Sequence, residues 1–223
     1  MEGCRSAFDC PWQGYSLPKG VPTIPPTVRR PRGPVYVVAS RSSYSVKLLL
    51  DEVRIREGVE RLAREVGEHY AGRSLTTIGV LTGSMVLLAD LIRRIDLPLR
   101  VGLVQARSYR GPATQPGQLV VHADLLPDLR GRDVLLVDDI FDTGHTLATL
   151  VQQLKLMGPA SIRSAVLLRK QGRQQAAIEP DHVAFEIPNE FVVGYGLDYQ
   201  DSYRHLPYIA TLESHELAEE PPR

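Results

Sequence analysis

A short apolar run, an acidic stretch and the start of a helical pattern follow one another in the middle of this chain. Val134-Leu135-Leu136-Val137 is purely apolar, which is typical of a strand buried on both faces of a parallel sheet. Apolar residues then recur at helical spacing: Leu147, Leu150, Val151, Leu154 and Met157. Residues 138–146 are therefore expected at the carboxyl end of a strand, where open α/β sheets bind ligands.

The segment 138–146 combines three carboxylates with the features of a phosphate site. Thr143-Gly144-His145-Thr146 opens the predicted helix, whose first amides have no internal partners, and it adds two hydroxyls and a glycine. Asp138, Asp139 and Asp142 would repel a bare phosphate. Carboxylates bind vicinal hydroxyls, however, and Mg²⁺ offsets the charge of a polyphosphate. The segment is therefore predicted to bind a phosphorylated sugar that carries a metal-bound phosphate group.

Three other interpretations share parts of this pattern. A Walker loop requires G-x-x-x-x-G-K-[ST], and the chain contains neither Gly-Lys-Ser nor Gly-Lys-Thr. A receiver domain also clusters aspartates, but it does not require Asp-Thr-Gly-x-Thr directly afterwards. Capping of the helix would need one aspartate, and the chain has three followed by Thr-Gly-x-Thr. The pattern favours the sugar phosphate.

Residues 134–146, VLLVDDIFDTGHT, resemble the phosphoribosyl diphosphate (PRPP) motif of type I phosphoribosyltransferases, and the surrounding chain is similar to the hypoxanthine-guanine branch. The resemblance extends over residues 35–212. It implies an α/β fold with a mostly parallel sheet, helices on both faces and a small hood over the base pocket. It also implies that Asp138 and Asp139 hold the ribose hydroxyls, and that residues 142–146 wrap the 5-phosphate. Asp142 would in addition accept a proton from N7 of a purine.

Two further segments resemble parts of the same site. Leu81-Thr82-Gly83-Ser84 is similar to the pyrophosphate loop, in which family members commonly have lysine where this chain has Thr82. Because that loop binds largely through backbone amides, we expect pyrophosphate binding to persist. Arg107-Ser108-Tyr109 begins a Gly-, Pro- and Gln-rich stretch that resembles the mobile lid over the site. Its glycines and prolines disfavour a regular element up to Gln118.

Residues 185–199, FEIPNEFVVGYGLDY, resemble the base pocket of the hypoxanthine-guanine enzymes. The resemblance implies that Phe191 stacks on the purine and that the backbone of Val192 meets the base edge. Asp198 would reach Mg²⁺ through water, so the expected metal residues are Asp198 and the pair Asp138 and Asp139. Arg204 would contact pyrophosphate.

Lys170 follows the predicted strand 161–168, where the family places a lysine on the 6-oxo group of the base. Only four of the 26 Lys and Arg residues are lysines, so a lysine at this position is unusual for the chain. An amine donor would face the 6-amino group of adenine, leaving buried donors unpaired at about 1–3 kcal/mol each. Hypoxanthine and guanine are therefore expected as substrates and adenine is not, while an exposed loop lysine is the alternative.

The implied reaction displaces pyrophosphate from C1 of the ribose, through a transition state with positive charge on the sugar ring. Two alternatives remain open at this point: an enzyme that prefers xanthine, and a PRPP-binding regulator of transcription or RNA without transferase activity. The 26 basic and 26 acidic side chains cancel, which gives no support to nucleic-acid or membrane binding through bulk charge. The family resemblance implies a homodimer or a homotetramer.

The ends of the chain differ from the middle. Residues 1–34 contain seven of the 17 prolines and both cysteines, which predicts a flexible tail. Cys4 and Cys10 lack the spacing of a metal pair. No apolar run approaches the ~20 residues of a membrane span, and the amino terminus lacks a secretory core, so a cytoplasmic location is expected. Residues 213–223 are polar and are expected to form a second tail, around a domain at 35–212.

Between these ends, strand and helix patterns alternate. Ile55, Val59, Leu62 and Val66 indicate an amphipathic helix with Asp51 as its cap. We expect further helices at 84–95 and 145–157, strands at 77–82, 99–105, 133–138 and 161–168, and hairpin strands near 118–126. Residues 35–38 and 45–50 are expected as short strands or a loop. This alternation predicts a parallel sheet that brings the loops 81–84 and 138–146 to one edge. No internal repeat is found.

Overall fold

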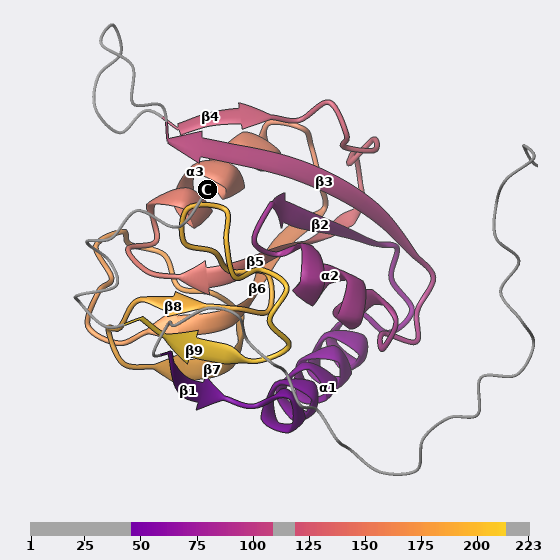
Figure 1. The fold of residues 1–223 in the computed structure, drawn as a ribbon. Coiled ribbons are helices and arrows are strands. Elements are labelled where there is room, and N and C mark those ends of the chain that lie inside the picture. Colours follow the sequence, from indigo (N-terminus) through magenta and orange to yellow (C-terminus); the bar gives the residue numbers. More distant parts are fainter. Residues whose placement is uncertain (1–45, 109–118, 213–223) are drawn as a thin grey trace, which may run out of the picture. The chain divides into compact units, whose positions relative to one another are not determined.

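A computed structural model of the chain describes residues 46–108 and 119–212. Its main sheet has the strand order β4-β3-β2-β5-β6-β7 (Figure 1). Five of these strands are parallel to one another, and β4 pairs antiparallel with β3. The strands are β2 (Leu75–Leu81), β3 (Leu99–Ser108), β4 (Leu119–His122), β5 (Asp133–Phe141), β6 (Ser161–Lys170) and β7 (His182–Ile187). The predicted mostly parallel sheet is confirmed.

Helices cover both faces of this sheet, as predicted. On one face, Leu135 and Val137 of β5 belong to a core that includes α1 (Glu52–His69) and α2 (Met85–Ile92). On the other face, Val134 and Leu136 pack in a second core with α3 (His145–Lys155). Because successive strand side chains point to opposite faces, a purely apolar run is what a central strand between two helical layers requires.

The first helix forms as its sequence pattern predicts. Asp51 is the N-cap, and its Oδ1 accepts a hydrogen bond of 2.8 Å from the backbone amide of Arg54. The apolar stripe at Ile55, Val59, Leu62 and Val66 is buried. Burying side chains of this size typically contributes about 1.5–3 kcal/mol each, so packing rather than helix propensity holds α1 on the sheet.

The main strands are longer than predicted at their carboxyl ends. We expected β5 to end at 138, but it pairs with β6 as far as Phe141 opposite Arg169, so Asp139, Ile140 and Phe141 are strand residues as well. Similarly β3 continues to Ser108 and β6 to Lys170. The helices are shorter than predicted: α2 ends at Ile92 and α3 at Lys155. Polar residues at these strand ends interrupt the apolar runs from which the strands were predicted. Backbone pairing does not depend on side-chain polarity, so the strands continue.

A second, small antiparallel sheet contains β1 (Lys47–Leu50), β9 (Ile209–Thr211) and β8 (Val192–Val193), in the order β1-β9-β8. It supplies the predicted hood, since β8 directly follows Phe191. The strands β7, β8 and β9 were not predicted. Of these, β8 and β9 are too short to show a period. Of the hairpin expected near 118–126, only β4 is a strand.

Three predicted regions fall outside the described residues: most of the amino-terminal segment including 35–38, the stretch 109–118, and residues 213–223. Within the described part of the chain, no helix has both the length and the apolar composition that crossing a bilayer would need.

Candidate functional site

The carboxyl ends of the neighbouring strands β2 and β5 border a cavity of about 250 Å³. Leu81, Thr82 and Gly83 line it together with Asp138 and Asp139. The predicted meeting of the loops 81–84 and 138–146 at one edge is therefore confirmed. The peptide bond between Leu81 and Thr82 is cis.

Two glycines make the close packing around this cavity possible. A Cβ on Gly83 would lie 1.7 Å from Oδ2 of Asp139. A Cβ on Gly196 would lie 2.3 Å from the carbonyl oxygen of Gly83, and Gly196 has a φ of +101°, which strains other residues. The turn after β2 thus lies between the acidic end of β5 and the segment that follows β8.

Asp138 and Asp139 are adjacent carboxylates, the first buried and the second half-buried. Asp138 is 8% exposed, and its Oδ1 accepts a 3.0 Å hydrogen bond from the amide of Asp139. The amide of Ile140 donates to Oδ1 of Asp139 at 2.9 Å. Burial raises the pKa of Asp138 well above its usual value, with a further contribution from the charge of Asp139, and burial also raises the pKa of Asp139.

This pair fits a divalent cation. Neither carboxylate forms an ion pair with another described residue, and a cation at their oxygens would offset the cost of burying their charge. Over the ranges 46–108 and 119–212, no group of three His, Cys, Asp or Glu side chains could hold a metal by itself. A Mg²⁺ ion here would therefore complete its octahedral shell with ligand and water oxygens.

The segment after β5 forms a second cavity, of about 170 Å³, at the start of α3. Asp142, Thr143, Gly144 and Thr146 line it. Gly144 is the N-cap of α3 with a φ of +85°, and no side chain caps the helix. Backbone amides at an uncapped helix start are available to an anion. This geometry is compatible with the predicted phosphate cradle, which stays a prediction.

A third cavity, of about 200 Å³, lies beside Phe191. The residues predicted to bind the base are brought together here, with two apolar neighbours that the sequence did not single out. The lining is Asp139, Ile140, Asp142, Lys170, Phe191, Val192, Leu197 and Asp198. The ring of Phe191 is 38% exposed and meets the ring of Tyr199 edge to face, with centroids 5.4 Å apart. An exposed aromatic face next to polar groups is suited to stacking a planar base.

Asp142 bears two cationic neighbours. Nζ of Lys170 lies 3.4 Å from Oδ2 of Asp142, and Nε of Arg173 donates to Oδ1 at 2.9 Å. The side chain of Lys170 is only 12% exposed, so the exposed loop lysine considered above is wrong. The role of Arg173 was missed, because no motif marks a residue in the turn after β6.

Arg204 and Asp198 were predicted separately and form an ion pair. One guanidinium nitrogen of Arg204 lies 2.8 Å from Oδ1 of Asp198, and the other donates to the carbonyl oxygen of Gly196 at 2.8 Å. Both side chains line the cavity beside Gly83. The pair is therefore a contact within the segment after β8, at the cavity that Asp138 and Asp139 also line.

The structure gives fewer contacts for the remaining predicted site residues. His145 begins α3, and its Nε2 lies 3.3 Å from Oε1 of Gln175. Arg107 and Ser108 are the last residues of β3, where their backbone pairs with β4. Tyr109 lies outside the described residues, so the lid stays a prediction.

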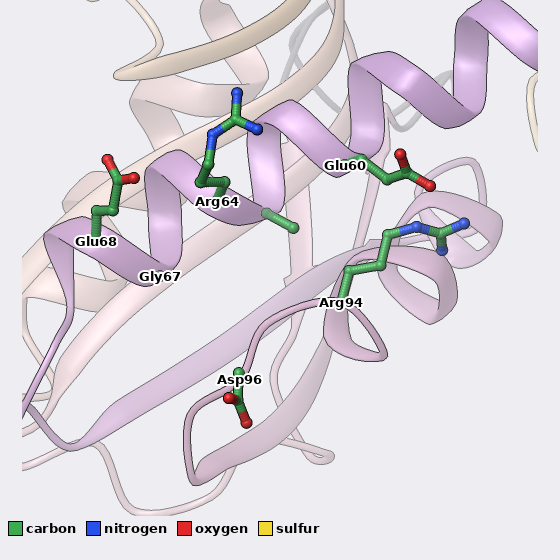
Figure 2. Close-up of a pocket in the computed structure, with 7 residues that line it drawn as sticks. Glu60, Arg64, Gly67, Glu68, Arg94 and Asp96 are labelled. Atoms are coloured by element: carbon green, nitrogen blue, oxygen red, sulfur yellow. The ribbon is translucent and has the colours of Figure 1, made fainter.

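Figure 2 shows a separate, more open cavity of about 440 Å³ beside α1. Its lining comes from the carboxyl-terminal half of α1 and from the segment between α2 and β3: Glu60, Ala63, Arg64, Gly67, Glu68, Arg94 and Asp96. None of the predicted site residues lines it. Although this cavity is larger, the chemistry indicated by the sequence gathers at the strand ends instead.

Comparisons with known proteins identify a family and several relatives that this chain resembles. The phosphoribosyl transferase domain family matches residues 45–200. A hypoxanthine-guanine phosphoribosyltransferase from Streptococcus pneumoniae is 40% identical over 167 residues, covering 75% of this chain and 93% of that protein. The bifunctional protein TilS/HprT from Listeria innocua is 41% identical over 75% of this chain, which spans 26% of that longer protein. The crystal structure of a hypoxanthine phosphoribosyltransferase from Staphylococcus aureus is similar at a TM-score of 0.73 and 37% identity, covering 78% of this chain and 94% of that one.

Proposed function

We propose that this chain, which belongs to the phosphoribosyl transferase domain family, transfers the phosphoribosyl group of PRPP to hypoxanthine or guanine in purine salvage. The products are IMP or GMP and pyrophosphate. The observation that carries the proposal is that three cavities adjoin through shared carboxylates. Asp139 lines the cavity beside Gly83 and the cavity beside Phe191, while Asp142 lines the latter and the phosphate cradle.

The three cavities match the 5-phosphate, the diphosphate and the base, with the ribose between them. The 5-phosphate of PRPP occupies the start of α3, where Thr143, Gly144, His145 and Thr146 meet it. The diphosphate lies against Leu81, Thr82 and Gly83, with Arg204 as the cationic contact. Asp138 and Asp139 accept hydrogen bonds from the ribose hydroxyls between them. Each group of the substrate is thus opposite protein atoms of complementary character.

Mg²⁺ is the proposed cofactor. Asp138 and Asp139 would hold it directly or through water, with Asp198 as an outer contact, and it would offset the negative charge of the diphosphate. Asp198 is paired with Arg204 at 2.8 Å in the structure. Substrate would therefore have to draw Arg204 towards the diphosphate before Asp198 could take part.

The base pocket accounts for purine selection. Phe191 stacks on the ring, and the backbone of Val192 pairs with the base edge. Lys170 donates to the 6-oxo group, for which it must leave Asp142, now 3.4 Å away. An adenine amino group would present a donor to this donor, and both would lack a partner in a buried site. Hence 6-oxopurines are favoured over adenine.

Asp142 is the proposed proton acceptor for N7 of the purine. A ring nitrogen of the purine forms a bond to C1 as the bond from C1 to pyrophosphate breaks, and pyrophosphate leaves while Asp142 takes the N7 proton. Positive charge develops on the ribose ring in this step, and neighbouring carboxylates stabilise it. Well-placed electrostatic groups of this kind are typically worth about 3–4 kcal/mol each, and a positioned general base about 100- to 10,000-fold in rate. The reactive sugar must be kept from water, which is the role proposed for a lid that begins at Arg107, Ser108 and Tyr109.

The family resemblance also supports a homodimer or homotetramer and a cytoplasmic location, both of which we put forward as proposals. Sedimentation of the purified protein tests the first. Association should depend on protein concentration but not on added nucleic acid or lipid vesicles.

A panel assay tests the function. PRPP and Mg²⁺ are incubated with hypoxanthine, guanine, xanthine or adenine, and nucleotide and pyrophosphate are both measured. We expect equimolar nucleotide and pyrophosphate with hypoxanthine or guanine. Turnover with xanthine alone would replace the assignment by a xanthine-preferring enzyme, and turnover with none of the four bases would refute purine transfer.

A further inference from the structure

The turn between β6 and β7 contacts the site through two sets of hydrogen bonds. The backbone amides of Gln175 and Ala176 both donate to the carbonyl oxygen of Thr143, each at 3.0 Å. His145 and Gln175 side chains meet at 3.3 Å. The turn is thus tied to the start of α3, where the phosphate cradle lies, and Arg173 belongs to it.

Arg173 is the one residue of this turn that reaches Asp142 within the described part of the chain. Its Nε donates to Oδ1 at 2.9 Å, whereas Lys170 approaches the other oxygen, Oδ2, at 3.4 Å. Each carboxylate oxygen therefore has its own cationic partner. The contact from Arg173 is the shorter of the two.

The two partners differ in what they can do during the reaction. Lys170 is 12% exposed and lines the base cavity, so a 6-oxo group can recruit its amine. Arg173 is 42% exposed and does not line that cavity, so a bound base leaves it in place. When Lys170 turns to the base, Asp142 loses one cation and keeps the other.

We propose that Arg173 is a positioning residue that holds the carboxylate of Asp142 towards the purine once Lys170 has moved to the 6-oxo group. The inference rests on the proposed function, because it assigns Arg173 a role only through Asp142. A partly exposed ion pair contributes little to folding stability, so the contact is expected to affect orientation rather than the fold. Misplacement of a reacting group by about 1 Å can cost about 100-fold in rate.

The test replaces Arg173 and measures rate and substrate binding separately. Arg173→Gln should lower kcat for hypoxanthine by about 10- to 100-fold, with little change in the dissociation constant of PRPP measured by calorimetry in Mg²⁺. Arg173→Lys keeps the charge and should recover part of kcat. If Arg173→Gln folds poorly, Arg173→Met serves as the second uncharged variant, and the same loss of kcat with wild-type PRPP affinity is expected.

Arg163→Gln is the matched control. Arg163 is also 42% exposed and pairs with an aspartate, Asp181, at 3.0 Å, but it lies near the amino end of β6. Its replacement should leave kcat unchanged. If Arg163→Gln lowers kcat as much as Arg173→Gln does, the loss reflects any broken surface pair and the proposal is wrong.

A double-mutant cycle separates this inference from the proposed function. In the Asp142→Asn background, Arg173→Gln should cause no further loss, because the two residues act as one unit. Wild-type kcat in Asp142→Asn would refute the proposed function and this inference together. An inactive Asp142→Asn with wild-type kcat in Arg173→Gln, or additive losses in the double mutant, would overturn the role of Arg173 alone.

Discussion

Gly83 lies so close to Asp139 that a Cβ added to it would stand 1.7 Å from Oδ2 of that carboxylate. The two residues come from different strand ends, and each lines the same cavity. The absence of a side chain at position 83 is therefore a condition for the acidic end of β5 to face the turn after β2.

Gly83→Ala should abolish PRPP binding. The new methyl group must displace Asp139 or the turn itself, and the diphosphate and ribose contacts are lost together. Calorimetric titration with PRPP and Mg²⁺ checks this. Gly67→Ala is the control, since a Cβ there meets nothing within 4 Å and alanine favours a helix. Retained PRPP affinity in Gly83→Ala would contradict the proposed cavity assignment.

Lys170→Ala should weaken the preference for hypoxanthine over adenine by about 5- to 150-fold, which corresponds to 1–3 kcal/mol for an unpaired buried donor. The ratio of kcat/KM for the two bases is the measurement. Lys155→Ala, at the exposed end of α3, should leave the ratio unchanged. If Lys170→Ala excluded adenine as strongly as the wild type, discrimination would have to come from the hood.

Tyr195→Phe should destabilise the protein in a pH-dependent way. The phenol donates to Oδ2 of Asp90 at 2.7 Å and so joins the segment after β8 to α2. Burial acts to raise the pKa of Asp90, but hydrogen bonds from Tyr195 and Arg93 outweigh it, so this pKa lies below its usual value. Because the folded-state pKa is depressed, the stabilisation is present above the ordinary carboxyl pKa of about 3.9 and is lost as pH falls below it.

The measurement for Tyr195→Phe is urea unfolding at neutral pH and at acid pH. We expect a loss of about 1 kcal/mol at neutral pH, allowing for partial exposure of the pair, and a smaller loss in acid. Asp90→Asn should remove this pH dependence. An equal loss at both pH values would mean that the phenol acts through packing and not through the charge of Asp90.

Asp138→Asn should make the ligand-free protein more stable while it weakens substrate binding. Replacing one of two buried neighbouring carboxylates removes their repulsion, and Tm should rise by about 2–4 °C for each kcal/mol relieved. The rise in Tm on adding PRPP and Mg²⁺ should shrink. Asp96→Asn, an exposed carboxylate, is the control. An undiminished ligand-induced rise would remove Asp138 from the proposed metal and ribose site.

Much of the fold could be predicted because the hydrophobic pattern of each long strand or helix lies within one short stretch of sequence. The apolar run 134–137 must be buried on both sides, and the stripe from Ile55 to Val66 can face only one core. Strand ends were misjudged where a strand continues past polar residues, as β5 does beyond Asp138 to Phe141. The strands β8 and β9 have two and three residues, too few for any period to appear.

Site residues could be predicted where they lie within a motif of the family. Contacts between segments far apart in the sequence could not. Asp142, Lys170, Phe191 and Asp198 were expected together, and one cavity contains all four. The contact from Arg173 to Asp142 spans 31 positions and follows from how the turn after β6 folds back. The approach of Gly196 to Gly83 likewise exists only in the folded chain.

The most direct test of the central claim is the turnover of Asp142→Asn, measured alongside its affinity for PRPP in Mg²⁺. The carboxamide keeps the size of the side chain but cannot act as the proton acceptor. We predict PRPP affinity close to that of the wild type and a kcat for hypoxanthine that is lower by at least about 100-fold. A kcat near the wild-type value would contradict the account, because Asp142 would then have no part in proton transfer.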